Sequence, residues 1–274
     1  MRGLGQLPPF SPILNKLLAT LANEDVPFAQ LAELIEKDAV LAGNVLRLVN
    51  SALYGRRGTI NSVRHAVSIM GLGKLRNTTM SLSVSRIWHQ VRTPAEWSSV
   101  DFNLHGAAVA ILADLLAQRV DAEYPEGAFA AGLLHDLGML LIAVSLPDDC
   151  NEARKLCLGS GRPLEDCERE ILGMDHAELS AAALEQWNLP PPIQKAVRFH
   201  HEPVRSADAV VSLSRIVHVA GAVADQLKIR VQPWSPADNH EPAGTLDTLG
   251  LGGAASEILE EFSQEFQAIR AFFR

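Results

Sequence analysis

Cysteine is scarce in this sequence, and the cysteines present are not spaced as metal or disulfide motifs. The chain of 274 residues has three, Cys150, Cys157 and Cys167, and no CxxC pair. An odd number without such spacing argues against a disulfide framework and against a zinc knuckle. We therefore expect ordinary helix residues in a reducing, cytoplasmic setting.

A long uninterrupted apolar run is also lacking. The most apolar stretch, residues 128–146, is broken by the polar pair His135-Asp136. A membrane-spanning helix needs roughly 18 uninterrupted apolar residues. Prolines interrupt the N-terminal segment where a signal peptide needs an apolar core. The sequence therefore predicts a cytoplasmic protein with no membrane partner.

Acidic residues are absent from one region, 39–95, although the whole chain has a net charge of −8. That region has eight basic residues, whereas residues 96–274 have 27 acidic against 13 basic residues. Such segregation of charge favours two parts that meet different partners or each other. The alternative is a mixed, solvated surface with an accidental gap in its acidic residues.

Strand signals are nearly absent, and the hydrophobic periodicity is helical along nearly the whole chain. We predict an all-α fold with two helical lobes. Pro94 breaks a long helix and marks the boundary between them. The predicted domains are an N-terminal helical lobe (1–94), a second helical lobe (95–232), and a loop with a C-terminal amphipathic helix that packs on the second lobe (233–274).

Capping residues locate several predicted helices. Asp38, Ser62 and Asp175 can each cap a helix, and Glu178 can complete a capping box with Asp175. A loop is predicted over residues 233–253, which are rich in Pro, Gly and Asp. The predicted helices that matter for the site span about 39–54, 63–70, 74–91, 103–118, 126–146, 148–158, 164–172, 176–187, 191–200, 208–228 and 254–273.

Side chains suited to metal binding recur along the second half of the chain. Neutral imidazole nitrogen and carboxylate oxygen suit borderline divalent metals such as zinc, iron or manganese. Each of these side chains lies in or beside a predicted helix, so several helices could aim them at one point. The pattern predicts a buried metal or phosphate site. Its members are His105, the pair His135-Asp136, His176 and the pair His200-His201.

A structural interpretation of the same residues remains open. A buried histidine commonly donates to a backbone carbonyl, and a buried His-Asp pair can cross-link helices without a metal. A cluster of unpaired imidazoles is nevertheless costly to bury. The other histidines have no comparable pattern and are assigned to surface or structural positions: His65, His89, His218 and His240.

Several longer phrases resemble one protein family. In the first lobe they are LPPFSPILNKLL, LIEKDAVLAGNVLRLVNSALYG and HAVSIMGLGKLRN, and in the second AAGLLHDLGMLLI, LGMDHAELSAAALEQWNLPPPI and HHEP. Together they resemble the HDOD family, the HD-related output domains of bacterial signalling proteins, over roughly residues 6–230. The resemblance implies an all-helical, two-lobed fold whose second lobe is HD-like, a relative of HD-superfamily phosphohydrolases.

The resemblance also implies a ligand set and a cofactor. HD-type hydrolases hold a metal through a His, an adjacent His-Asp pair and a later Asp, and two-metal relatives add further histidines. The implied cofactor is a divalent metal: iron, manganese, zinc or magnesium. The matching positions are His105, His135 and Asp136 for the first three ligands and His176, His200 and His201 for the added histidines.

Departures from that pattern argue against catalysis. Gly221 stands where the final Asp is expected. Asp225, four residues on, could replace it only if its helix shifted by about one turn, ~5.4 Å. Met139 stands where HD-GYP relatives, which hydrolyse cyclic di-GMP, have a Lys, and the Gly-Tyr-Pro that follows their HHE element is missing. A cyclic-dinucleotide hydrolase is therefore a poor match.

The leading hypothesis is a non-catalytic signalling or adaptor module that acts through protein–protein contacts. The resemblance implies partners in bacterial signal transduction: a response regulator, a kinase or a cyclic-dinucleotide enzyme. The expected partner surface lies in the first lobe and comprises Asn50, Ser51, Tyr54, Arg56 and Arg57.

Two alternatives stay open. A metal-dependent phosphohydrolase could use the predicted site to act on a nucleotide or phosphate ester. A nucleotide or nucleic-acid binder could use the basic first lobe, although no nucleic-acid-binding motif supports it. The final helix has an apolar stripe that fits its own core better than a partner or a homodimer mate. The stripe consists of Ile258, Leu259, Phe262, Phe266, Ile269 and Phe273.

Overall fold

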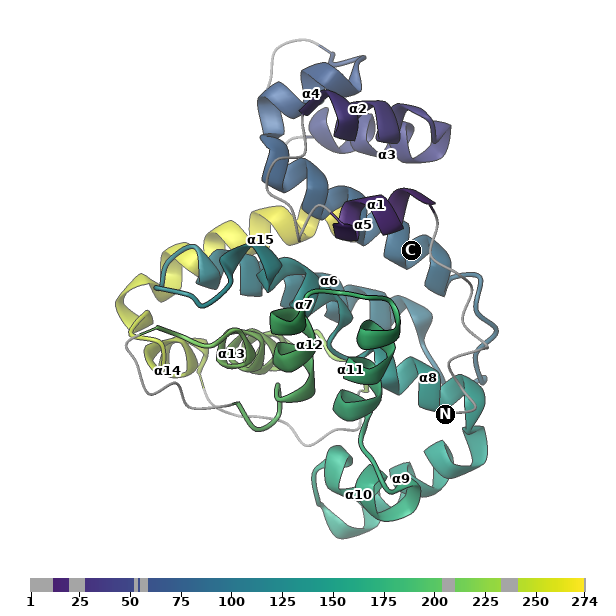
Figure 1. The fold of residues 1–274 in the computed structure, drawn as a ribbon. Helices are drawn as coiled ribbons and strands as arrows, with labels where there is room; N and C mark the ends of the chain where they lie inside the picture. Colours follow the sequence, from purple (N-terminus) through teal and green to yellow (C-terminus); the bar gives the residue numbers. More distant parts are fainter. Residues whose placement is uncertain are drawn as a thin grey trace.

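Helices and the turns that connect them account for nearly all of the computed structural model (Figure 1). Across the described part of the chain, the only strand-like pairing is an isolated bridge between Ala122 and Val211. The all-α prediction is therefore confirmed. The structure describes residues 12–19, 28–51, 54, 59–203, 210–232 and 241–273.

A small group of helices forms the upper part of the molecule in Figure 1. It consists of α2 (Phe28–Glu36), α3 (Ala39–Val49), α4 (Val63–Met70) and the start of α5 (Leu72–Trp88). These helices are amphipathic, and their apolar faces meet in one core. The core includes Leu31, Ile35, Val45, Leu48, Val63, Val67 and Leu75.

The predicted caps fix the ends of these helices. Asp38 Oδ1 accepts the backbone N–H of Leu41 at 3.0 Å, and Ser62 caps α4. Gly71 ends α4 with a φ of 79°, a conformation that residues with a Cβ rarely adopt. The predicted bounds of α4 are confirmed.

The larger core lies below this group and is built around α6 (Ser99–Ala117) and α7 (Ala128–Leu134). The two helices approach closely, since a Cβ on Gly132 would lie 2.8 Å from the backbone of Ala110. Their sequences are apolar on nearly every side because other helices surround them. α12 (Pro191–Arg198) and α13 (Leu213–Gln226) pack against them, and α8 (Leu137–Ser145) and α11 (His176–Gln186) add side chains to the same core. The short turn η3 (Pro125–Gly127) leads into α7.

Two apolar stretches would be long enough to cross a membrane by length and composition. They are Ser99–Ala117 and Pro125–Ser145, whose most apolar windows are 72% and 89% buried inside the fold. The core helix of a large helical domain needs the same apolarity. Packing against the other helices explains the composition of both stretches.

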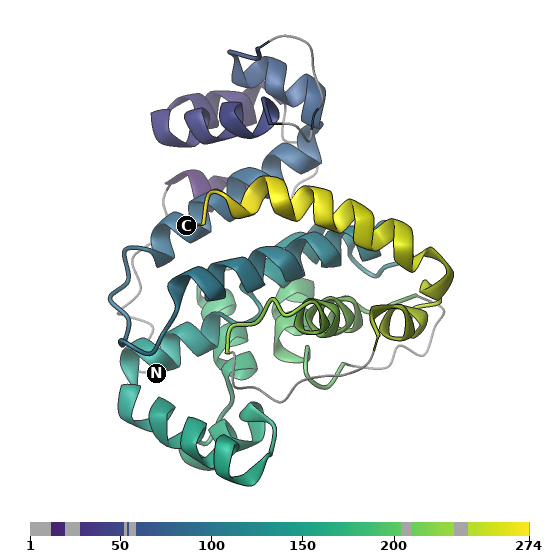
Figure 2. The ribbon, with the colours of Figure 1, turned by 180° about the vertical axis from the view of Figure 1, so that it is seen from behind.

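Helices from both ends of the chain join the two groups. α1 (Pro12–Ala19) and the second half of α5 contribute side chains to the larger core, and α15 (Ala255–Arg270) runs across the waist of the molecule (Figure 2). Lys74 Nζ of α5 lies 2.5 Å from Glu265 Oε1 of α15. The domain boundary at Pro94 stays a prediction, but the packing core already changes within α5.

The apolar stripe of α15 faces the inside of the molecule. Ile258, Phe262, Phe266, Ile269 and Phe273 are all buried, with at most 7% of any of them exposed. The stripe therefore covers the chain's own core, as its periodicity favours.

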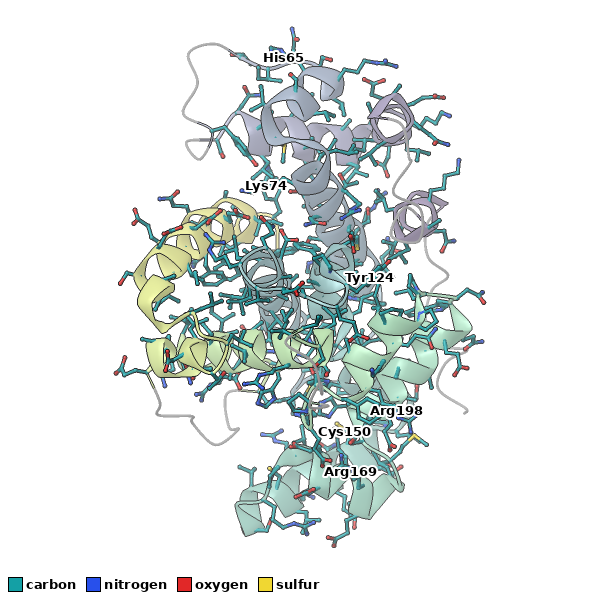
Figure 3. The ribbon with its side chains drawn as sticks, turned by 60° about the vertical axis from the view of Figure 1, so that its left-hand side comes forward. His65, Lys74, Tyr124, Cys150, Arg169 and Arg198 are labelled. Carbon is teal, nitrogen blue, oxygen red and sulfur yellow. The ribbon has the colours of Figure 1, made fainter. Side chains whose placement is uncertain are left out.

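A helical hairpin projects at the lower end of the molecule. It is formed by α9 (Pro147–Ser160) and α10 (Leu164–Leu172), and Figure 3 labels Cys150 and Arg169 within it. All three cysteines are free thiols in these helices, and two of them, Cys157 and Cys167, are buried in the hairpin's own small core. The prediction of ordinary helix cysteines is confirmed.

Two predicted segments need correction. The predicted loop over 233–253 contains α14 (Pro242–Asp247), which begins with a proline in its first turn, and the short turn η4 (Gly252–Ala254). α3 ends before Asn50, short of the predicted end near residue 54. The Asn50 side chain stops it, because its amide donates to the backbone oxygen of Ile60 at 2.8 Å and accepts that residue's N–H at 2.7 Å.

Candidate metal centre

The predicted ligand residues converge on one carboxylate in the larger core. Asp136 lies between α7 and α8, and 11% of its side chain is exposed. Its Oδ1 lies 3.2 Å from His135 Nε2, 3.5 Å from His176 Nε2 and 3.6 Å from His200 Nε2. Its Oδ2 lies 3.5 Å from His105 Nε2. Residues far apart in the sequence therefore meet at one point.

A break in the helical backbone aims Asp136 at these rings. The prediction of one helix over residues 126–146 is wrong, because α7 and α8 are separated at His135 and Asp136, where Asp136 has φ −96° and ψ 12°. The backbone N–H of Gly138, freed by the break, donates to Ser180 Oγ at 2.7 Å. A Cβ on Gly138 would overlap the backbone oxygen of His176, so the new helix packs directly against the start of α11.

Backbone carbonyls fix the tautomers of three rings. A carbonyl oxygen only accepts, so each facing Nδ1 carries the proton and each Nε2 presents a lone pair in the neutral ring. All three Nε2 atoms face the carboxylate of Asp136. Rings held in this way are typical of metal ligands. The pairs are His105 Nδ1 with Ile229 O at 2.7 Å, His135 Nδ1 with Gly132 O at 2.8 Å and His200 Nδ1 with Val197 O at 2.7 Å.

A carboxylate that the sequence reasoning missed orients a fourth ring. Glu168 of α10 is 4% exposed, and its Oε2 lies 2.5 Å from His176 Nδ1 and accepts the His176 backbone N–H at 2.9 Å. A carboxylate–histidine pair fixes the ring and raises its basicity as a ligand. The signal was present in the sequence, since Glu168 lies one helical turn from both Leu164 and Leu172 and therefore on the apolar face of α10.

The predicted cap fixes the first residue of α11. Asp175 Oδ1 accepts the backbone N–H of Glu178 at 2.7 Å, and its Oδ2 pairs with Arg169 Nη2 at 2.6 Å. The reciprocal half of the capping box is wrong, because Glu178 Oε1 instead lies 3.3 Å from Arg198 Nη2. His176 is thereby held at the helix start, where its ring points to the cluster.

His176, His200 and His201 form a second ligand group. Their ligand atoms lie within 4.8 Å of one another, as do those of the other three predicted ligands. The Nε2 atoms of His176 and His201 are 2.7 Å apart. Among the residues that the structure describes, the buried Nε2 of His200 has no hydrogen-bond partner. A buried polar atom without a partner is costly, and a cation would satisfy this lone pair.

The donor set fits one or two divalent cations. Two groups of three ligand atoms are present, and the groups share no residue although Asp136 lies close to both. Five of the six donors are imidazoles, which suit zinc, iron and manganese. Magnesium, the fourth predicted option, prefers oxygen ligands and fits this set less well.

Burial and neighbouring charge set the protonation of the cluster. Burial lowers the pKa of His200 and of His201 well below the ordinary range. Burial alone would raise the pKa of Asp136, but the surrounding imidazoles hold it well below its usual range. Burial also disfavours a charge on His176, yet the adjacent Glu168 carboxylate raises the pKa of His176 to about 10. The cluster therefore combines an ionised carboxylate and the neutral rings of His200 and His201 with His176, which keeps its proton until a bound cation displaces it.

The α13 wall lacks the fourth ligand of the HD pattern. A Cβ on Gly221 would meet no neighbouring atom of the described residues within 4 Å, and the position borders a cavity. Asp225 Oδ1 lies 4.0 Å from Nδ1 of His105, on the side of that ring away from Asp136, and is 41% exposed. Asp225 therefore does not replace the missing carboxylate in this arrangement.

The cluster opens into a cavity of about 420 Å³. His218, which the sequence analysis left as a surface or structural residue, borders it, and its Nδ1 lies 2.7 Å from the backbone oxygen of His200. Met139, which follows the His135-Asp136 pair, borders it as well. Arg230, also on its wall, was missed because it follows the end of α13 outside any motif.

Two of the remaining histidines stay apart from the cluster. His65 is exposed on the smaller group of helices, well away from the larger core (Figure 3), and His89 is exposed as well. Their assignment to the surface is confirmed. His240 lies outside the described residues.

The predicted partner surface is placed only in part. Arg56 and Arg57 lie outside the described residues, and Ser51 is half-buried. The Asn50 side chain bonds the backbone of the segment that leads into α4. Tyr54 is largely buried, and burial raises its pKa to about 12. The partner surface stays a prediction, with Asn50 and Tyr54 also contributing to the fold.

Comparison with known proteins gives a family and one curated relative. The model of the HDOD domain matches residues 7–203. An uncharacterized protein of Treponema pallidum (strain Nichols) is 25% identical over 200 residues, which cover 72% of this chain and 38% of the relative. The chain therefore spans well under half the length of that curated relative.

Solved structures similar to this one share its fold over nearly all of this chain. An HDOD domain protein of unknown function from Geobacter sulfurreducens is 24% identical with a TM-score of 0.77, covering 97% of this chain and 92% of that one. A candidate phosphohydrolase from Shewanella amazonensis SB2B is 26% identical with a TM-score of 0.76, covering 99% and 96%. A candidate signal transduction protein from Marinobacter aquaeolei VT8 is 21% identical with a TM-score of 0.74, covering 97% and 60%.

Proposed function

The chain belongs to the HDOD domain family, and we propose that it is a metal-binding signalling module of that family. In this proposal the larger lobe (95–232) holds one or two divalent cations. The N-terminal lobe (1–94) contacts a protein partner. The bound cation stabilises the fold or changes the conformation of the module, and the site does not catalyse a reaction.

The main support for metal binding is that ring nitrogens of the histidine cluster face one another without enough hydrogen-bond donors. Three imidazoles bond backbone carbonyls through Nδ1, so their Nε2 atoms have no proton to donate. The Nε2 of His200 has no partner among the described residues. Close approach of lone pairs around one carboxylate favours a divalent cation as the missing partner.

Some residues of the chain would bind such a cation, and others orient the side chains that bind it. Carbonyl oxygens and Glu168 orient the rings, and the break between α7 and α8 orients Asp136. A bound divalent cation supplies Lewis-acid polarisation of a phosphate oxygen. One group of ligands would be His105, His135 and Asp136, and the other His176, His200 and His201.

The α13 wall supports a non-catalytic role. Gly221 offers no side-chain ligand, and Asp225 faces the wrong nitrogen of His105. Met139 replaces a Lys that hydrolytic relatives have in the same phrase. A hydrolytic site needs its ligands and its charge-stabilising groups placed within a few tenths of an ångström, so these changes weigh against turnover.

A metal-dependent phosphohydrolase is the second candidate. The cavity of about 420 Å³ beside the ligands favours it, because a purely structural metal site is normally closed. The 26% identical relative named as a candidate phosphohydrolase also supports it. Its substrate would be a nucleotide or another phosphate ester.

Family membership supports a place in bacterial signal transduction. The expected partner is a response regulator, a kinase or a cyclic-dinucleotide enzyme. Part of the positive charge of the N-terminal lobe is neutralised by acidic residues of the chain itself, since Arg86 Nη1 pairs with Asp38 Oδ2 at 2.8 Å. Lys74 is likewise paired within the chain, with Glu265, whereas Arg64 and Arg92 are exposed and can meet a partner.

A phosphatase screen on the metal-loaded chain tests the choice between the two candidates. The full chain is reconstituted with Mn²⁺ and assayed with p-nitrophenyl phosphate and bis(p-nitrophenyl) phosphate beside an Asp136→Asn variant. The signalling module predicts bound Mn²⁺ and no turnover above the variant. Turnover that Asp136→Asn abolishes would establish the hydrolase and contradict the non-catalytic role.

A further inference from the structure

Arg230 is a cation in the wall of the metal cavity that the proposed function does not use. Its Nε donates to the backbone oxygen of Asp225 at 3.1 Å, which holds the guanidinium beside the end of α13. Its Nη2 is buried and, among the described residues, has no hydrogen-bond partner. A buried donor without an acceptor is costly, so a small movement of this side chain that brings Nη2 to a ligand oxygen in the cavity would be favoured.

The space beside Arg230 is of ligand size. The cavity of about 420 Å³ that it borders is far larger than the roughly 30 Å³ share of one water and lies in the range of small-molecule pockets. Gly221, in the same wall, leaves the space where a Cβ would stand unfilled within 4 Å. Gly221, which provides no metal ligand, therefore also leaves space in the cavity for a bound molecule.

The charge of the cavity depends on the metal. Three carboxylates, those of Asp136, Glu165 and Asp225, border it and would repel an anion in the metal-free chain. One or two divalent cations at the ligand groups oppose this charge and add to the guanidinium of Arg230. An anion is thus favoured only in the metal-loaded cavity.

We infer that the metal-loaded cavity binds a small phosphate-bearing anion, with a phosphate group between Arg230 and the metal ligands. This inference rests on the proposed metal binding and names the ligand class of the same site. A guanidinium presents a planar fork of donors that matches phosphate oxygens. The apolar side chains of Leu164, Val217 and Val231 border the same cavity and suit the remainder of such a molecule.

Calorimetric titration of inorganic phosphate into the Mn²⁺-loaded full chain, at constant ionic strength, tests the inference. Arg230→Gln is expected to weaken phosphate binding by about tenfold or more, because a charge-assisted pair is lost. Arg230→Lys keeps the charge without the fork and is expected to bind with intermediate affinity. The matched control is Arg64→Gln, an exposed arginine of α4, which is expected to bind phosphate as the parent does.

A second variant tests the space rather than the charge. A Cβ at Gly221 would meet no atom of the described residues within 4 Å and the position borders the cavity, so Gly221→Leu is expected to leave the fold and the Mn²⁺ content unchanged. Phosphate binding is expected to fall because the side chain projects into the cavity. Thermal melts and Mn²⁺ analysis of every variant separate a loss of ligand from a loss of fold.

Unchanged phosphate affinity in Arg230→Gln with Mn²⁺ retained would overturn the inference and leave the proposed function intact. Absence of phosphate binding to the Mn²⁺-loaded parent would do the same. Equal competition by acetate would reassign the site to carboxylates and overturn the phosphate class. If the parent chain binds no Mn²⁺, the proposed function fails and the inference fails with it.

Discussion

The metal centre and the junction between the lobes both bury polar side chains, but they neutralise them in different ways. At the junction Lys74, Asn77, Asp114 and Glu265 line a cavity of about 30 Å³. Lys74 supplies a positive charge to Glu265 at 2.5 Å, so the junction contains both signs. At the metal centre the Asp136 carboxylate faces three Nε2 lone pairs, those of His105, His135 and His200, so these facing atoms are all acceptors.

The two clusters differ in whether they need a partner from outside the chain. A mixture of donors and acceptors can pair within the chain, as Lys74 and Glu265 do, although the buried Asn77 Oδ1 has no hydrogen-bond partner among the described residues. A set made of acceptors cannot, because each member needs a donor or a cation that its neighbours lack. The junction is therefore expected to act on stability alone, and the histidine cluster to act on metal binding.

The largest effect is expected from Asp136→Asn. The change keeps the size of the side chain but removes the charge that lies close to both ligand groups. Metal affinity should fall by at least about a hundredfold, more than loss of an outer partner causes. Titration calorimetry with Mn²⁺ or Zn²⁺ measures this, with Asp148→Asn, exposed at the start of α9, as the control. Equal affinities for the two variants would break the comparison.

Glu168→Gln should have the next largest effect. The amide keeps a hydrogen bond to the backbone of His176 but no longer supports its ring with a full charge. Metal affinity is expected to fall roughly ten- to a hundredfold. Glu170→Gln, two residues on in the same helix and 52% exposed, is the matched control and should bind metal normally. A normal affinity in Glu168→Gln would remove the carboxylate from the metal-centre account.

Lys74→Met should act on stability and leave metal affinity unchanged. It leaves Glu265, 15% exposed, without its cation, and urea unfolding should show a loss of roughly 1–2 kcal/mol. Lys37→Met removes a partner from an exposed pair with Glu33, where the loss of stability should be much smaller. A loss of metal binding in Lys74→Met would show that the two clusters are coupled.

The smallest effect is expected from Asp114→Asn and is best seen as a pH dependence. Burial, with the nearby Glu265, raises the pKa of Asp114 to about 6, above its value of about 3.9 in an unfolded chain. The folded state therefore binds more protons between about pH 4 and pH 6, so the free energy of unfolding falls as pH rises through that window.

Asp114→Asn removes this slope and should gain stability over the parent at pH 7.5 relative to pH 4.5. Urea unfolding of both chains in EDTA at the two pH values measures the difference. A parent and variant with parallel pH profiles would contradict a raised pKa at the junction.

The sequence predicted helix bounds well where a capping residue or a glycine ends the helix. Ser62 and Gly71 bound α4 as predicted, and the predicted span of α10 is the observed one. The single helix over 126–146 failed because apolar periodicity continues across the break, which is caused by packing of Gly138 against α11. Local pattern cannot report a contact made by a segment far along the chain.

The same limit applies to the candidate site. The ligand positions could be predicted because the phrases that contain them resemble a family, and the structure brings those positions together. Glu168 and Arg230 could not be assigned roles in the same way, since one acts through His176 and the other borders the cavity from beyond α13. Their roles depend on three-dimensional neighbours rather than on spacing.

Elemental analysis of the full chain, purified without chelator and then dialysed, tests the central claim most directly. The account predicts at least about one zinc, iron or manganese ion per chain, with most of it lost in Asp136→Asn. Fewer than about one ion in ten chains, even after incubation with excess metal, would contradict it. The histidines would then be a buried network held together by the protein alone.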